Sequence, residues 1–210
     1  PNWCAPLHNS KINAEEMQKI RSGYTEMFDL CAQTQAGFLH SVDHRETFEV
    51  TDKERTAFWE HLYASKGFGI WQGNFKDVLT DPAANKLMSD FVADKIRNRV
   101  NNPDIAEKLI PKDHGFGTRR VPLETNYYES YNNKNVELID INENPIERIT
   151  AEGILTKEKE YKFDFIIYAT GFNAILGSYD KIDIQGVNGL KLKDQWQQKL
   201  STFVGMQVNN

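Results

Sequence analysis

The run from residue 163 to residue 169, FDFIIYA, constrains the fold more than any other stretch, because it is almost continuously apolar. It is short, rich in aromatic and β-branched side chains, broken only by Asp164, and it stops at Thr170-Gly171. Such runs are typical of strands buried on both faces of a parallel sheet. Ligands of open α/β sheets lie beyond the carboxyl ends of these strands. The run therefore predicts a core strand with a site near Gly171; a core strand that ends in a plain glycine turn is the alternative.

Composition limits the classes of function. The chain has 210 residues, 40% hydrophobic and 26% charged, with a formal net charge of -5. This is an ordinary globular profile that could form one large domain or two small ones, and it gives no reason to expect a nucleic-acid partner. No apolar run approaches the length of a membrane span. Cys4 and Cys31 are too few for a disulfide framework, which predicts a reducing, cytoplasmic location.

The two ends of the sequence carry no terminating signals. The chain begins at Pro1 without a methionine and ends at Asn210 with no closing element, so we expect it to be a piece of a longer protein.

Capping signals predict a mainly helical block over residues 13–110. They place helix starts at Asn13, Thr51, Asp81 and Asn102. We expect one apolar face to run from Met17 to Cys31 and the second helix to end near Gly67. The glycine-rich stretch GFGIWQGNF is predicted to be a loop without phosphate-binding spacing.

Residues 32–50 hold the only histidine pair with metal-ligand spacing. His40 and His44 stand four residues apart, with acidic neighbours, but no further histidine cluster or cysteine completes a site. A solvated polar turn is the favoured interpretation, and we predict no metal.

The pattern changes after Pro111 to short alternating segments. A short helix and a strand over Val136–Asp140 are predicted, followed by strands over 145–150, 153–156 and 161–169. Residues 141–160 therefore predict a β-hairpin or meander placed before the buried strand.

Arg119 and Arg120 follow a glycine-containing loop, FGTRR. A guanidinium is always charged and presents a planar fork suited to a phosphate or to a developing anion. A pair of surface arginines that only solvates the loop is the alternative.

The sequence resembles Baeyer–Villiger monooxygenases of the single-component FAD and NADPH type. The resemblance is most specific at FGTRR, NYYE, PIERIT and ATGFNA, and the opening PNWCAPLHN and closing TFVGMQVNN follow the same order. It implies a flavoprotein with two dinucleotide-binding domains and a large helical insertion, α/β in class, which uses FAD, NADPH and O₂ on a ketone.

The resemblance also implies roles for individual residues. Arg120 matches the family's active-site arginine, which stabilises the flavin peroxide anion and the adduct it forms with the ketone. Arg119 matches the basic residue at the NADPH 2′-phosphate, where the family often has lysine. Thr170 and Gly171 would bind the cofactors at the domain junction.

The same resemblance divides the chain into four parts. Residues 1–16 would end the first NADP-domain segment, and residues 17–125 would form the helical insertion. Residues 126–172 would return to the NADP domain, and residues 173–210 would begin the second, incomplete FAD-domain segment.

Neither G-x-G-x-x-G nor the family's F-x-G-x-x-x-H-x-x-x-W stretch occurs in the sequence. Both are expected before Pro1, in missing N-terminal parts of the same enzyme, and the C-terminal part is expected after Asn210. The isolated fragment is therefore predicted to be inactive. A flavin monooxygenase that oxidises nitrogen or sulfur, and a non-catalytic interaction module or fold remnant, remain alternatives.

Overall fold

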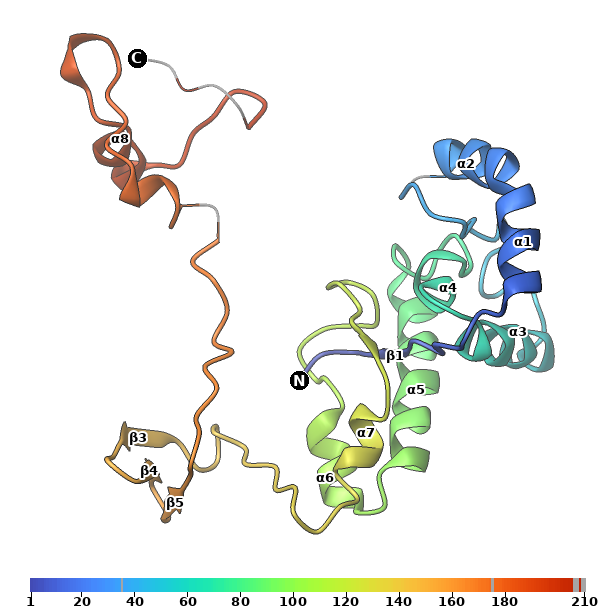
Figure 1. Ribbon diagram of the computed structural model, residues 1–210, viewed down its shortest axis with the longest axis horizontal. Helices are drawn as coiled ribbons and strands as arrows, with labels where there is room; N and C mark the ends of the chain where they lie inside the picture. The colour runs from blue at the N-terminus through green and yellow to red at the C-terminus, as the bar shows by residue number, and fades with distance from the viewer. Residues whose placement is uncertain (35, 175, 206–207, 209–210) are drawn as a thin grey trace. The chain divides into compact units, whose positions relative to one another are not determined.

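The computed structural model describes residues 1–210 except residues 35, 175, 206, 207, 209 and 210. The described chain separates into two compact units, Pro1–Asn144 and Pro145–Asn210 (Figure 1). The helices of the first unit are α1 (Ala14–Ser22), α2 (Tyr24–Gln33), α3 (Asp52–Ala64), α4 (Gly69–Gln72), α5 (Pro82–Arg99), α6 (Pro103–Leu109) and α7 (Tyr127–Ser130). Strands accompany helices in both units, so the predicted mixed α/β class is confirmed.

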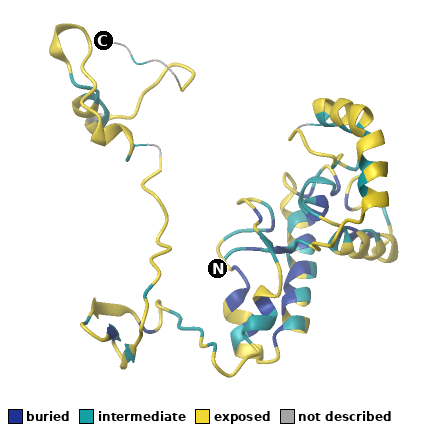
Figure 2. Ribbon diagram, viewed as in Figure 1, coloured by how far each residue is buried: buried dark blue, intermediate teal, exposed yellow. Residues whose placement is uncertain are grey.

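The predicted first helix is two helices. Asn13 caps α1 in a capping box with Glu16, as the sequence predicts. The apolar face from Met17 to Cys31 is not continuous, because Gly23 ends α1 and begins α2. Glycine has the most backbone freedom to lose in a helix, so a break falls there readily. Neither helix has a buried residue, and both are coloured mainly as exposed in Figure 2.

Helix α5 forms the centre of the core of the first unit. Five of its side chains are buried, and these are Ala84, Met88, Val92, Ala93 and Ile96. From α3, Trp59 packs its ring 5.5 Å from that of Phe91. The three- and four-residue spacing of the apolar side chains in α5 is what gives the helix one continuous buried face.

Local signals set most of the helix starts. Thr51 and Glu54 form the second predicted capping box, and Asn102 caps α6. The helix predicted to end near Gly67 ends at Ala64, with Ser65 as an extended C-cap. The predicted glycine-rich loop contains the single turn α4.

The cap of α5 yields a stability prediction. The Asp81 carboxylate accepts a hydrogen bond from the Ala84 N–H at 2.8 Å, and Pro82 follows at the first helical position. We expect Asp81→Ala to lower the free energy of unfolding by about 1 kcal/mol, because one N–H loses its acceptor. Asp81→Asn keeps the oxygen and is the control in urea denaturation. Equal losses in both variants would contradict a capping role.

A parallel pair of strands joins distant parts of the first unit. Strand β1 (Ala5–Pro6) pairs with β2 (Leu123–Glu124), and the Ala5 N–H donates to the Pro122 carbonyl at 3.0 Å. The pairing holds the N-terminal segment beside the residues that directly follow Arg120.

The second unit begins with a small antiparallel sheet of order β3-β4-β5. Its strands are β3 (Ile146–Ile149), β4 (Gly153–Thr156) and β5 (Glu160–Lys162). Strands β3 and β4 confirm the hairpin predicted over residues 141–160, while β5 lies mostly in the stretch predicted to be the buried strand. Two 3₁₀ turns, Tyr179–Lys181 and Val187–Gly189, and the helix α8 (Leu192–Gln198) follow.

Two predicted strands are wrong. The described residues of the run 163–169 form no strand, and Phe165 and Ile167 are 89% and 90% exposed. The hydrogen bonding of the small sheet ends at the first residue of the run, where the Phe163 N–H donates to the Glu152 carbonyl at 2.9 Å. A buried strand of a parallel sheet requires a parallel partner strand and cover on both faces, and no described strand pairs with this run. Val136–Asp140 is likewise irregular.

No helix within the described ranges is both long and apolar enough to cross a membrane.

Candidate functional site

The loop that carries the two arginines is packed tightly against the helical block. Gly117 adopts a φ of +75°, and a Cβ built there would lie 2.8 Å from Leu79 Cδ2 and 2.9 Å from Trp71 Cδ1. The Trp71 indole N–H donates to the Gly117 carbonyl at 3.2 Å. Both the backbone conformation and the close approach therefore require glycine at this position.

Phe116 anchors the same loop from the other side. Its side chain is 1% exposed, and its ring meets Trp3 edge-on at 6.4 Å. The Asn85 side-chain amide donates to the Phe116 carbonyl at 2.9 Å, and the Phe116 N–H donates to Ser89 Oγ at 2.9 Å. Helix α5 thus fixes the backbone just before the arginines.

The structure brings Arg119 and Arg120 together on this loop in different surroundings. Arg119 forms an ion pair with Asp113 at 2.9 Å, and its side chain is 57% exposed. Arg120 is exposed, and its carbonyl accepts a hydrogen bond from the Asn2 amide at 2.9 Å. Within the described residues its guanidinium has no hydrogen bond or ion pair. It is therefore available to an anionic ligand, while Val121, 1% exposed, anchors the following backbone.

Asp113 and His114 are in contact with each other, and Asp113 also contacts Arg119. His114 contacts the Asp113 carboxylate through Nδ1 at 2.7 Å, and this contact, with the nearby charge of Arg119, lowers the pKa of Asp113. The carboxylate is therefore ionised around neutral pH. No spacing pattern in the sequence marks either residue as part of a site.

A cavity of about 570 Å³ adjoins the loop. The surface that its lining exposes is mostly apolar, although six of the eleven lining residues have polar side chains. The lining comprises Leu30, Gln33, Thr34, Ala36, His40, Ser41, Val42, His44, Trp71, Gln72 and Leu79. Trp71 and Leu79 are the two side chains that also contact Gly117. A largely apolar cavity with a few polar groups is the usual form of a small-molecule site.

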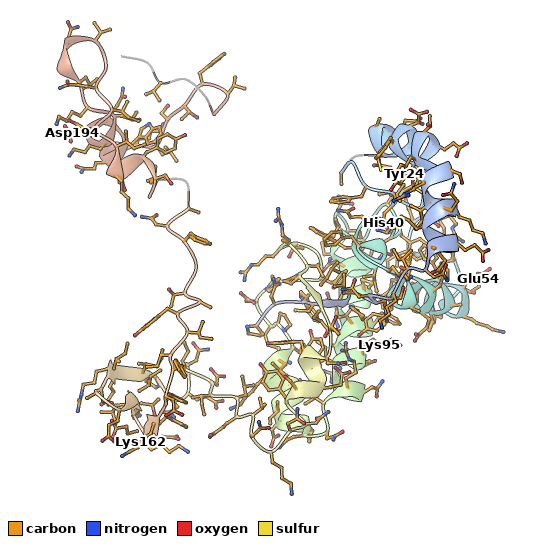
Figure 3. The ribbon with its side chains drawn as sticks, viewed as in Figure 1. Tyr24, His40, Glu54, Lys95, Lys162 and Asp194 are labelled. Atoms are coloured by element: carbon orange, nitrogen blue, oxygen red, sulfur yellow. The ribbon has the colours of Figure 1, made fainter. Side chains whose placement is uncertain are left out.

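Two polar groups of this cavity are notable. The Gln72 side-chain oxygen is buried and has no hydrogen-bond partner within the described residues. The other is His40, whose side chain is labelled in Figure 3. Burial lowers the pKa of His40, which keeps the imidazole neutral near pH 7. Sequence reasoning considered His40 and His44 only as a metal pair. Across the described chain, no three His, Cys, Asp or Glu side chains gather as a metal site.

Thr170 and Gly171 belong to the second unit, on the exposed stretch that follows the small sheet. Gly171 has a φ of +86°, and a Cβ there would meet no atom within 4 Å. Their predicted contact with cofactors stays a prediction.

Comparison with known proteins gives strong matches over almost the whole chain. No protein-family model matches. The chain is 49% identical over 208 residues to the 2-oxo-Delta(3)-4,5,5-trimethylcyclopentenylacetyl-CoA monooxygenase of Pseudomonas putida, covering 99% of this chain and 38% of that enzyme. It is 38% identical over 209 residues to a Baeyer-Villiger monooxygenase of Pseudooceanicola batsensis, covering 97% of this chain and 37% of that one. The crystal structure of OTEMO with FAD and NADP matches with a TM-score of 0.91 and 49% identity, covering 97% of this chain and 38% of that structure.

The fold and the matched sequences place the chain in the class of flavoprotein monooxygenases that have two dinucleotide-binding domains. Within that class, the chain belongs to the Baeyer–Villiger-type monooxygenases and corresponds to one segment of these enzymes. It spans 38% of the length of the Pseudomonas relative.

Proposed function

We propose that the complete protein is a Baeyer–Villiger monooxygenase that uses FAD and NADPH to insert one oxygen atom from O₂ into a ketone, giving an ester or lactone. The observation that carries the proposal is the exposed Arg120 guanidinium, which has no partner within the described residues. It lies on a loop whose Gly117 packs against two side chains of a cavity with a mostly apolar surface. FAD supplies the activation of O₂ when it is bound, and the protein supplies binding, orientation and electrostatics.

Arg120 provides a fixed positive charge where negative charge develops during the reaction. Its guanidinium cannot lose a proton at working pH, so the charge is permanent. The packing of Phe116 and Gly117 holds the loop before any ligand arrives. A charge already in place needs little reorganisation at the moment of reaction, which is how such groups lower a barrier.

Arg119 binds the 2′-phosphate of NADPH in this proposal. The donor chemistry fits, because a planar guanidinium can give two parallel hydrogen bonds to phosphate oxygens. The residue therefore gives preference for the phosphorylated dinucleotide over NADH.

The ketone occupies the cavity beside Gly117. Leu30, Val42 and Leu79 provide apolar contact, and the neutral His40 provides a polar group that orients the substrate. In support, the name of the Pseudomonas relative describes a 2-oxo-cyclopentenyl compound.

We further propose the division into domains. Residues 1–16 and 126–172 belong to the NADP domain, 17–125 to the helical insertion, and 173–210 to the FAD domain, with Thr170 and Gly171 beside the cofactors. The other segments of the same enzyme hold the FAD pyrophosphate, so the 210-residue chain alone does not catalyse. Both cysteines are free, in keeping with a cytoplasmic location.

The test is a substrate comparison with the complete enzyme. We expect NADPH oxidation that depends on cyclic ketones, with lactone formed in proportion to NADPH consumed, because the site combines an apolar cavity with a fixed cation. Amines and sulfides should give at least about ten-fold lower kcat/KM, a difference of about 1.4 kcal/mol in barrier. Preferential oxidation of an amine or sulfide would assign the protein to the sister class, and a chain that never binds flavin would indicate an interaction module.

A further inference from the structure

Asp113 contacts Arg119 on one side and the buried His114 side chain on the other. One carboxylate oxygen accepts from Arg119 Nη2 at 2.9 Å, and the other contacts His114 Nδ1 at 2.7 Å. Within the part of the chain that the structure describes, one guanidinium nitrogen of Arg119 is engaged in this way. The remaining N–H groups of its fork stay open to a second anion.

His114, which contacts Asp113, is itself held in place by Trp3 and Asn2. The His114 side chain is 6% exposed, and its carbonyl accepts from the Trp3 indole N–H at 2.9 Å. Its second ring nitrogen lies 3.1 Å from the Asn2 side-chain oxygen. The orientation of the Asn2 amide is fixed, because its NH₂ group donates to the Arg120 carbonyl. A continuous chain of contacts therefore joins the backbone of Arg120 to the side chain of Arg119.

We propose that Asp113 is a positioning residue that sets the preference of the enzyme for NADPH over NADH. Asp113, itself held in place by His114, binds one nitrogen of the Arg119 guanidinium and so orders this long side chain. The remaining N–H groups of the guanidinium then face the 2′-phosphate. The inference rests on the proposed function, in which Arg119 meets that phosphate. Ordering the arginine in advance removes an entropy cost from cofactor binding.

The test uses Asp113→Asn in the complete enzyme, with anaerobic reduction of the flavin by NADPH and by NADH. Asparagine can still accept from His114 through its oxygen, but its NH₂ group repels Arg119. An exposed ion pair contributes little to stability, so the variant should fold normally. We expect the Kd for NADPH to rise about five- to ten-fold, with the Kd for NADH and both limiting reduction rates unchanged.

A double-mutant cycle with Arg119→Ala separates the two levels of the proposal. In the Arg119→Ala background, Asp113→Asn should have no further effect on NADPH, because the group that it positions is gone. Asp90→Asn removes another exposed carboxylate that is paired with Lys86, and serves as the matched control.

Each outcome decides a different claim. An unchanged or tighter Kd for NADPH in Asp113→Asn would overturn the positioning role, the tighter value indicating a carboxylate that competes with the phosphate. If Arg119→Ala itself leaves the preference for NADPH intact, the proposed function of Arg119 fails, and the positioning role fails with it. Loss of preference in Arg119→Ala alone would leave the function of Arg119 standing and remove only that of Asp113.

Discussion

Arg120→Ala is expected to abolish oxygen insertion in the complete enzyme while NADPH still reduces the flavin. Removing a single group that stabilises developing negative charge typically lowers kcat by about 10²–10³-fold. Flavin reduction needs no such charge at this position, so its rate should stay within about two-fold of the wild-type value. The measurement is a single-turnover experiment that follows the reduced enzyme, O₂ and ketone, with the lactone quantified by chromatography.

Arg120→Ala should remove the guanidinium without disturbing the packing around it. The Arg120 side chain is exposed and unpaired within the described residues, and its contact with Asn2 is made by the backbone carbonyl, which alanine retains. Folding should therefore be unaffected. Arg120→Lys keeps a positive charge without the planar fork and should recover part of the activity. Arg21→Ala, on the exposed helix α1, controls for the loss of a surface charge. Lactone formation by Arg120→Ala at the wild-type rate would remove the residue from the mechanism.

Features that depend on adjacent residues were predictable from the sequence. The Asn13 and Thr51 capping boxes and the Asp81 cap need only a few neighbouring residues, and all three are present as expected. The break at Gly23 is a local effect of glycine that the apolar periodicity of residues 17–31 does not reveal. The single turn α4 depends on tertiary packing, which outweighs a local pattern. The run 163–169 reads as a buried strand, yet its state depends on strands that the described chain does not contain.

The site divides in the same way. Residue type and the resemblance pointed to Arg119 and Arg120 without any coordinates. The cavity brings α2, the segment around His40 and α4 together with Leu79, so no single stretch of sequence announces it. The contact of Asp113 with His114 and Arg119 depends on the path of the loop around Gly117, which spacing alone does not specify.

The Asn74 side chain is a buried polar group with several hydrogen-bond partners in the first unit. It is 3% exposed, and its side-chain oxygen accepts from the Trp59 indole N–H and from the Phe75 N–H, both at 2.9 Å. Its NH₂ group donates to the Ile70 carbonyl at 3.0 Å and contacts Met88 Sδ at 3.3 Å. One amide thus ties α3, α4 and α5 together directly behind the cavity wall that Trp71 provides.

Asn74→Ala should therefore be the most destabilising single change predicted here. It leaves the Trp59 and Phe75 donors and the Ile70 carbonyl buried without partners, and each such group costs about 1–3 kcal/mol. We expect the free energy of unfolding to fall by about 3 kcal/mol, and Tm by roughly 6–12 °C, in denaturation of the 210-residue chain followed by far-UV circular dichroism.

The controls for Asn74 isolate the network from side-chain truncation. Asn133→Ala removes an exposed asparagine that bonds only the Ser130 carbonyl, at 3.1 Å, and should change stability by no more than about 0.5 kcal/mol. Trp59→Phe deletes the indole donor, so the two changes combined should cost less than the sum of their separate effects. Strict additivity would mean that the amide and the indole act independently. Trp71 of α4 also packs against Gly117, so loss of the Asn74 network should loosen the arginine loop as well. The proposed chemistry therefore depends on an intact Asn74 network.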